Sequence, residues 1–307
     1  MAKDAVAICG HSRQIKYLEK LKERGMPISA FLFSGGDELG KKTIALSFVA
    51  GLFCKEKKAP GTLACGNCEN CARVIGGTHP DFEIIAGDNE IGIQQIRELK
   101  RRLALSPYAG SYRGVLIDDA HLLTSDAEGA LLKILEEPPA NSLFLLVTSH
   151  PHLLFETIRS RLLELSFMPV PEDEMKRWAA ANLPEAEDAD SSLAIAEGRP
   201  GRLKRFLENP EYFREEKARI AKFRPLIKKP LVDQFLFSER LSGEGEREIG
   251  SFFQFLISEM RKDLLNGHEA GVLEKIKNLL AFYFRLETTN VNARLLIDSA
   301  LLELRNL

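Results

Sequence analysis

Apolar residues recur at two different spacings along this chain of 307 residues. In the first half, the uncharged runs 30–33, 114–117 and 142–149 have the length and composition of buried parallel strands. Between them, the runs 43–53 and 122–137 have the apolar spacing of helices. Strands that alternate with helices in this way predict an α/β domain built on a parallel sheet.

The second of these helices has recognisable end signals. Ser125 followed by Glu128 has the spacing of a capping box, and Pro138 ends the helical pattern. We therefore expect the helix to begin at Ser125.

The last third of the chain has a helical pattern throughout. Its apolar residues recur at helical spacing in two stretches, which are Phe252, Phe255, Leu256 and Met260, then Leu273, Ile276, Leu279 and Leu280. Such faces are typical of helix–helix contacts. Prolines near 169–171 and 210 mark boundaries. We expect three domains, at residues 1–168, 169–209 and 210–307.

Composition narrows the function classes. The chain is 45% hydrophobic and 28% charged, which is ordinary for a globular protein, and its formal net charge is −2. Mild acidity argues against independent, tight nucleic-acid binding, because such binding depends on neutralising phosphates with a basic face. No apolar run approaches the roughly 20 residues of a membrane helix, and the N-terminus has no signal-peptide core. We expect a cytoplasmic protein.

The segment between the first strand and its helix resembles a phosphate-binding loop. In the pattern G-x-x-x-x-G-K-[ST], glycines let backbone N–H groups surround phosphates, and the lysine neutralises them. Gly35, Gly40 and Lys41 fit this pattern, and Gly36 adds a further glycine. The segment predicts a nucleotide-type loop. The alternative is a strand-to-helix turn without a ligand.

One position in the loop departs from the pattern. Lys42 stands where a Ser or Thr hydroxyl normally ligates Mg²⁺, and an ammonium has no lone pair for a metal. Thr43 carries a hydroxyl, but one residue along a helix rotates it by about 100°. ATP and Mg²⁺ binding is therefore doubtful, and hydrolysis more so.

Polar residues follow two of the predicted strands. Asp118 and Asp119 end the run that begins at Gly114, where a nucleotide site would use the first acid for Mg²⁺ and the second as the water-polarising group. Capping the next helix is the alternative role. Thr148 ends the following strand, where its hydroxyl would sense the γ-phosphate or make local hydrogen bonds.

Four of the five cysteines form a cluster: Cys54, Cys65, Cys68 and Cys71. In a reducing compartment this density predicts a metal site before disulfides. Zn²⁺ takes four thiolates in a tetrahedron, which leaves no open position, so we expect a structural zinc in a module at about residues 54–71. An iron–sulfur cluster and unligated thiols are the alternatives. Cys9 lies apart in an apolar stretch and is expected to be buried.

Several motifs in this order resemble the bacterial DNA polymerase III clamp-loader family over roughly residues 5–205. They are Gly10-His11, the loop at 35–41, the cysteine insert, Thr78-His-Pro-Asp81, Val115-Leu-Ile-Asp-Asp119, Leu131-Leu-Lys-Ile-Leu-Glu-Glu-Pro-Pro139 and Thr157-Ile-Arg-Ser-Arg161. The resemblance implies an AAA+ fold: a RecA-like α/β domain with an inserted zinc module, a small helical lid domain and a C-terminal helical collar domain that oligomerises.

Three departures favour the non-motor delta-prime branch of this family over its gamma/tau motors. They are Lys42, Asp119 in place of a glutamate, and a chain that ends at Leu307 without a long tail. The resemblance then implies no independent catalysis, with ATPase activity in partner subunits. It implies a hetero-pentamer with gamma/tau and delta subunits, which reaches the sliding clamp and primer–template DNA through the complex.

The resemblance also assigns two arginines. Arg161 falls on the arginine of a Ser-Arg-Cys motif that reaches across an interface to a neighbour's ATP, although Leu162 replaces the cysteine. Arg202 falls near a second sensing arginine of the lid domain. A basic run, Lys100 to Arg102, would either face solvent or approach DNA. Two alternative functions are a gamma/tau-type ATPase and a zinc-knuckle nucleic-acid-binding protein.

Overall fold

The structure is a computed structural model that describes residues 8–25, 28–56, 62–108, 112–182, 189–265, 267, 271–288 and 291–305. Part of the predicted zinc module, residues 57–61, lies outside the described residues. The chain forms two compact units, Met1–Glu208 and Asn209–Leu307. The division coincides with the boundary expected near Pro210, while the finer division into three domains stays a prediction.

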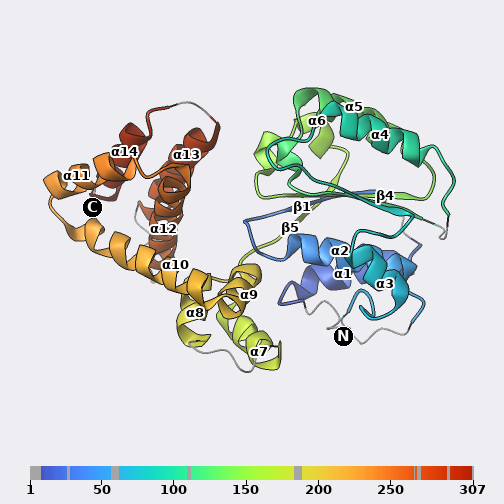
Figure 1. Ribbon diagram of the computed structural model, residues 1–307, viewed down its shortest axis with the longest axis horizontal. Coiled ribbons are helices and arrows are strands. Elements are labelled where there is room, and N and C mark those ends of the chain that lie inside the picture. Colours follow the sequence, from blue (N-terminus) through green and yellow to red (C-terminus); the bar gives the residue numbers. More distant parts are fainter. Residues whose placement is uncertain are drawn as a thin grey trace. The chain divides into compact units, whose positions relative to one another are not determined.

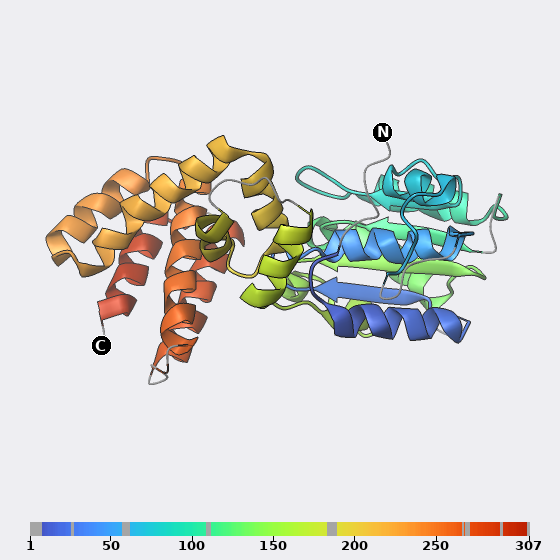
Figure 2. The same cartoon turned by 90° about the horizontal axis from the view of Figure 1, so that it is seen from below.

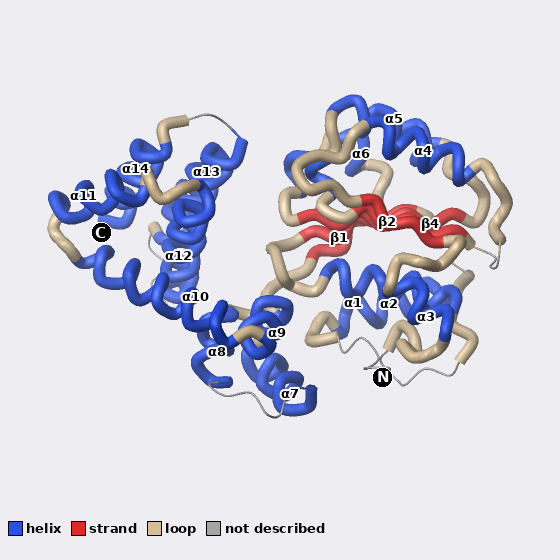
Figure 3. The backbone as a smooth tube through the Cα atoms, in the orientation of Figure 1, coloured by secondary structure: helices blue, strands red, loops and turns tan. Residues whose placement is uncertain are grey.

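The first unit is built on one parallel sheet. Its strands are β1 (Ala30–Ser34), β2 (Phe82–Ile85), β3 (Arg113–Ile117), β4 (Ser142–Thr148) and β5 (Leu163–Ser166). Their order in the sheet is β2-β3-β4-β1-β5, and every neighbouring pair is parallel. The strands lie between two layers of helices (Figure 3). The α/β fold with a parallel sheet is confirmed.

Alternate residues of the strands supply two separate cores, one on each face of the sheet. Phe31 and Phe33 of β1 are buried against helices on one face, while Leu32 is buried on the other. Helices α1, α2 and α3 cover the first face, and α4, α5 and α6 cover the second (Figure 1). Figure 2 shows α1 and α2 side by side on their face.

The nine α-helices described in the first unit are α1 (Ser12–Glu23), α2 (Lys41–Phe53), α3 (Glu69–Ile75), α4 (Ile93–Leu103), α5 (Ser125–Glu136), α6 (Glu156–Arg159), α7 (Glu172–Asn182), α8 (Ala189–Ala196) and α9 (Pro200–Glu208). The last three follow the sheet in sequence and contain no strand. Gly198 joins them to the segment after β5, because its carbonyl accepts a hydrogen bond of 2.8 Å from Val170 N–H.

The second unit is entirely helical in its described part. It contains α10 (Pro210–Phe223), α11 (Leu231–Leu241), α12 (Glu246–Leu265), α13 (Val272–Thr288) and α14 (Ala293–Arg305). Six of the eight residues predicted to form an apolar face are buried in its core, whereas Leu273 and Leu280 are exposed. No helix in the described part of the chain combines the length and the apolarity needed to cross a membrane.

The predicted capping box of α5 is wrong. Thr124 caps the helix instead, since its hydroxyl accepts a hydrogen bond from the N–H of Ala127. Glu128 is buried and turns away from the helix start, where its carboxylate accepts a hydrogen bond of 3.1 Å from Phe155 N–H. Glu128 therefore makes a hydrogen bond to a residue distant in sequence instead of to the start of its own helix. The helix ends at Glu136, two residues before Pro138, as expected.

Candidate functional site

The loop between β1 and α2 lies at the carboxyl edge of the sheet. Gly35 has φ 140° and Gly40 has φ 90°, which L side chains rarely adopt. The backbone also approaches closely here, because a Cβ on Gly35 would lie 2.3 Å from the carbonyl oxygen of Phe167. Gly35 is therefore required both by the backbone conformation and by the space around it.

Lys41 is folded back onto the loop. It begins α2 and is almost fully buried, and its Nζ donates hydrogen bonds of 2.6 Å to the carbonyl oxygens of Gly35 and Gly36. Burial lowers the pKa of Lys41, an effect that the nearby carboxylates of Asp37, Asp119 and Asp118 oppose. The lysine is placed as a phosphate-binding loop requires, with the loop's own carbonyls as its partners.

Lys42 contacts the first of the two aspartates that follow β3. Its Nζ lies 2.7 Å from Oδ2 of Asp118, whose side chain is 15% exposed while that of Lys42 is 51% exposed. Asp119 has a left-handed backbone conformation, with φ 48°, and begins a short 3-10 helix, η1 (Ala120–Leu122). Burial raises the pKa of Asp119, and the neighbouring charge of Asp118 raises it further.

The strand register brings the predicted residues of this edge together. Ser34 pairs with Thr148 across β1 and β4. Thr148 is fully buried, and its hydroxyl lies 3.1 Å from Nδ1 of His121 and accepts a hydrogen bond of 3.0 Å from His150 N–H. Local partners therefore hold the hydroxyl in this structure. The role of Thr148 as a phosphate sensor stays a prediction, and so does nucleotide binding by the hydroxyl of Thr43.

The sequence reasoning missed one arginine near this loop. The charge of Arg199 acts on Lys41 and lowers its pKa, whereas the guanidinium of Arg202 lies over the ring of Phe206, 5.5 Å from its centre. Arg199 comes directly before Pro200, the first residue of α9. The same helix start contacts the loop, because Gly201 N–H donates to the carbonyl oxygen of Glu38 at 2.8 Å. The sequence did contain a signal: proline favours the first position of a helix, so Pro200 predicts a helix start directly after Arg199.

The four clustered cysteines meet at a single point. Their sulfur atoms all lie within 4.8 Å of one another, and Cys65 Sγ lies 3.8 Å from Cys71 Sγ. Four thiolates about 2.3 Å from one Zn²⁺ in a tetrahedron would have their sulfurs about 3.8 Å apart. Cys54 follows α2, Cys68 precedes α3 and Cys71 is buried on α3. The donor set and its spacing fit a metal ion.

None of the five cysteines, all of which the structure describes, forms a disulfide. Burial raises the pKa of Cys9 to about 12, with a further contribution from Glu174, so this thiol stays protonated near neutral pH. Partial burial also acts to raise the pKa of Cys65, but hydrogen bonds from the backbone N–H groups of Cys68 and Asn67 outweigh it and bring the pKa to about 7. Burial raises the pKa of Cys71 as well, so what sets the four cysteines apart from Cys9 is that their sulfur atoms lie together. Cys9 is a buried apolar residue, as expected.

Arg161 lies between α6 and β5 with about a third of its side chain exposed. One terminal nitrogen donates to Oε1 of Glu136 at 2.7 Å, and the other donates to the carbonyl oxygen of Thr157 at 2.8 Å. Leu162, which replaces a cysteine of the family motif, is buried in the core on the side of α4 and α5. The guanidinium is thus oriented by three groups of its own chain, the third being the hydroxyl of Ser160.

Arg161 and the loop lie at opposite edges of the sheet. Leu163 pairs with Phe31 near the start of β1, whereas the loop follows Ser34 at the end of the same strand. Because parallel strands rise about 3.3 Å per residue, Leu163 and Gly35 are separated by about 13 Å along the strand direction, and Arg161 precedes Leu163 at the end away from the loop. This distance exceeds the reach of an arginine side chain, so Arg161 does not reach the loop of its own chain.

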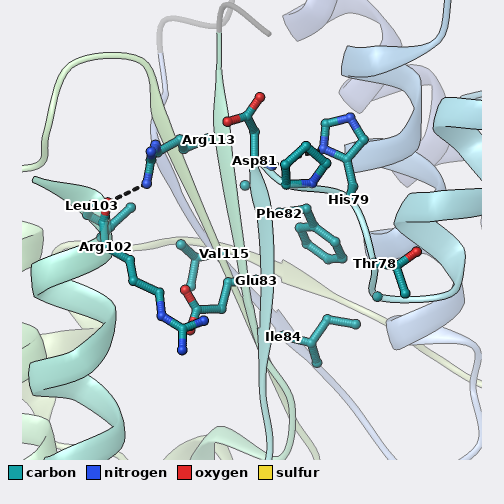
Figure 4. A pocket seen from close by; sticks show the side chains of 13 residues that line it. Thr78, His79, Asp81, Phe82, Glu83, Ile84, Arg102, Leu103, Arg113 and Val115 are labelled. Carbon is teal, nitrogen blue, oxygen red and sulfur yellow. Dashed lines mark hydrogen bonds and ion pairs between the residues drawn. The ribbon is translucent and has the colours of Figure 1, made fainter. Parts of the chain in front are cut away.

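A pocket of about 390 Å³ lies at the amino ends of β2 and β3 (Figure 4). The Thr78-His-Pro-Asp81 motif forms one side of it. Asp81 accepts a hydrogen bond of 2.6 Å from Tyr108 N–H, and its own N–H donates to Nδ1 of His79. The ring of His79 lies 4.1 Å from that of Phe53, at the end of α2. The motif therefore joins the cysteine-bearing segment to the sheet.

The basic run on α4 is largely paired with acids. Arg101 lies 2.8 Å from Glu98, and Arg102 lies 3.2 Å from Glu98 and 3.3 Å from Glu83. These exposed pairs neutralise much of the local positive charge. The predicted approach of this run to DNA stays a prediction.

Together, the parallel sheet, the glycine loop after β1 and the acids after β3 define a P-loop type of α/β protein. The model of the family described as "DNA polymerase III, delta subunit" matches residues 10–171, just over half of the chain. The chain belongs to this family. The resemblance drawn from the sequence motifs is thereby confirmed.

Curated relatives agree with this assignment. DNA polymerase III subunit delta' of Escherichia coli K12 is 34% identical over 176 residues, covering 56% of this chain and 52% of the relative. Subunit delta' of Pseudomonas aeruginosa is 31% identical over 225 residues, covering 71% of this chain and 66% of the relative. DNA polymerase III subunit tau of Bacillus subtilis is 37% identical, covering 45% of this chain and 24% of the relative. The chain thus spans about half to two thirds of the two delta' relatives.

Solved structures include a gamma subunit-related protein of DNA polymerase III from Thermotoga maritima. It is 20% identical, with a TM-score of 0.47, and the likeness covers 94% of this chain and 98% of that one. The family assignment rests on the sequence matches.

We predict that Gly35→Ala destabilises the first unit by roughly 1–3 kcal/mol, because the new Cβ meets a backbone oxygen at a strained φ. Gly36→Ala is the matched control, since its Cβ would meet only Leu39 Cδ1 at an ordinary 3.8 Å. Urea unfolding of the full chain, followed by hydrogen exchange of the β1 amides, measures both. Equal stability of the two variants would show that the loop accommodates a side chain at position 35.

Proposed function

We propose that the chain works as the delta-prime subunit of a DNA polymerase III clamp loader. In this role it is a non-motor subunit that assembles with gamma/tau and delta subunits and helps to load the sliding clamp onto primed DNA. It supplies Arg161 to ATP bound by a neighbouring subunit, and it leaves hydrolysis to that neighbour.

The position of Arg161 carries this proposal. The guanidinium is partly exposed and is held by Glu136 and Thr157, at the edge of the sheet opposite its own loop. An arginine with a planar, permanent charge suits the stabilisation of phosphate charge. Since the register places it at the end of the strands opposite its own loop, more than about 13 Å away along the strands, a nucleotide that it serves would belong to another subunit.

The carboxyl edge supports a non-motor role. Asp118, which would hold Mg²⁺ in an active site, is already paired with Lys42 at 2.7 Å. Asp119 stands where gamma/tau-type motors have a longer glutamate. The first departure occupies the carboxylate that would hold the metal, and the second shortens the side chain that would polarise the attacking water.

The helical unit supports assembly with partners. Apolar side chains are exposed on α11 and α14, two helices joined by a hydrogen bond between Ser238 and Asp298. The exposed residues are Val232, Leu236, Leu295 and Leu302. Exposed apolar side chains on packed helices suit a subunit interface. The relatives named above are DNA polymerase III subunits, which supports other subunits of that complex as the partners of this surface.

We expect the purified chain to show no ATP turnover above background, with or without primed DNA, because neither Lys42 nor Asp119 can replace the missing groups. A steady-state phosphate-release assay measures this, and Lys41→Ala is the control for contaminating ATPase. Turnover by the wild-type chain that Lys41→Ala abolishes would favour the alternative, a gamma/tau-type ATPase.

In a complex reconstituted with gamma and delta subunits, Arg161→Ala should abolish the contribution of one ATP site while the complex still assembles. Arginine fingers are worth about 10³–10⁵ in rate at the site that they serve. DNA-stimulated ATPase measures the loss, and gel filtration checks assembly. Arg159→Ala is the matched control, since Arg159 lies two residues before Arg161 and pairs with Glu164. Unchanged turnover in the Arg161→Ala complex would remove the trans role.

We also propose that the four cysteines hold a structural Zn²⁺. The sulfur spacing and the closed set of four donors support zinc over a catalytic metal, which would need an open position. When bound, zinc would join the end of α2 to the start of α3 and so stabilise the insert.

Metal analysis of the purified chain should find about one zinc per chain, and Cys68→Ser should lose most of it and lower the melting temperature. Cys9→Ser is the matched control, because Cys9 is buried outside the cluster. Iron with a visible charge-transfer band would indicate an iron–sulfur cluster instead. Full zinc content in Cys68→Ser would refute a four-thiolate site.

A further inference from the structure

The ion pair between Lys42 and Asp118 has a chemical consequence at the loop. In a phosphate-binding loop, the hydroxyl after the lysine and the acid after the neighbouring strand together hold Mg²⁺. Here the side chain at the hydroxyl position is an ammonium, and it contacts that acid directly, 2.7 Å from Oδ2. The two groups that would share the metal are bonded to each other.

Mg²⁺ does not fit the residues present at this position. The ammonium of Lys42 has three donors and no lone pair, so it adds no ligand. Its positive charge beside Asp118 also repels a second cation. Mg²⁺ also requires a nearly octahedral set of oxygen ligands. Of the two side chains in the Lys42–Asp118 ion pair, only Asp118 provides an oxygen.

We propose that the Lys42 ammonium takes the place of the divalent cation, so that this loop binds the phosphates of a nucleoside diphosphate without metal. The inference rests on the assignment of residues 35–42 to a nucleotide-type loop. It does not use the trans role of Arg161. Lys42 neutralises Asp118, which is one of three carboxylates near the loop together with Asp37 and Asp119, and so lowers the negative charge that a phosphate meets at this edge.

The remaining loop residues fit the same ligand. Gly35 and Gly40 have the positive φ values that direct backbone N–H groups toward a phosphate. Lys41 is buried, and its ammonium donates hydrogen bonds of 2.6 Å to two loop carbonyl oxygens. A phosphate would compete with these neutral oxygens for the hydrogen bonds of the ammonium. The charge of Arg199 also reaches Lys41. Lys41, Lys42 and Arg199 therefore bring three cations near the loop, where they offset the three carboxylates of Asp37, Asp118 and Asp119.

Isothermal titration of the full chain with ADP, in Mg²⁺ and in EDTA, tests the proposal. The wild-type Kd should agree between the two buffers within about twofold, because no metal takes part. Lys42→Thr restores the hydroxyl of the G-x-x-x-x-G-K-[ST] pattern and frees Asp118, so its Kd should become at least about tenfold tighter in Mg²⁺ than in EDTA. Adding Asp118→Asn to Lys42→Thr should remove that dependence.

Two further variants test whether the effects come from the ammonium of Lys42. Lys16→Thr changes an exposed lysine on α1 and should behave as the wild type. Lys42→Ala leaves Asp118 unpaired without adding a ligand, and it should weaken ADP binding in EDTA by about fivefold or more. Circular dichroism confirms that each variant is folded.

Three results would overturn the proposal: at least tenfold tighter wild-type binding in Mg²⁺, full metal-free affinity in Lys42→Ala, or no ADP binding by the wild type in either buffer. The last result would mean that Lys41 closes the loop against phosphate. All three concern the lone chain, so they leave the ATPase assay of the Arg161→Ala complex as an independent test of the proposed function.

Discussion

Parallel pairing of the strands around β1 is the constraint on which the other features depend. Because all five strands run in one direction, whatever follows a strand lies at one edge of the sheet and whatever precedes a strand lies at the other. The glycine loop and the two aspartates follow strands and meet at the carboxyl edge. Arg161 precedes β5 and lies at the amino edge. The sheet thus places the loop and Arg161 at opposite ends of its strands, more than about 13 Å apart.

At the carboxyl edge, one substitution changes the charge balance of the site. Asp118 needs a cation partner, because a carboxylate that is 15% exposed loses most of its hydration. A metal would supply that cation in an active enzyme, whereas Lys42 supplies it here from within the chain. The acid after β3 is therefore paired with a cation that the chain itself provides.

The sequence predicted those features that depend on local patterns. The strands at 30–34 and 142–148, the cysteine cluster and the end of α5 before Pro138 all follow from composition, spacing or backbone geometry. Features that depend on tertiary contacts were not predictable. Glu128 left its capping role for Phe155 N–H, and the pairing of Lys42 with Asp118 joins residues 76 positions apart in sequence. Arg199 was overlooked in favour of Arg202 because only the folded chain shows which of the two acts on Lys41.

The loss of the cysteine at position 162 leaves Arg161 in place. Leu162 is buried in the core beside α4 and α5, so this position serves packing, and an apolar residue is suited to it. Orientation of the guanidinium comes from Glu136, Thr157 and Ser160, which are all present. Since sites far apart without shared partners change independently, the carboxyl edge can lose its metal chemistry without disturbing the arginine. A subunit that retains one edge and alters the other is therefore a physically consistent state of this fold.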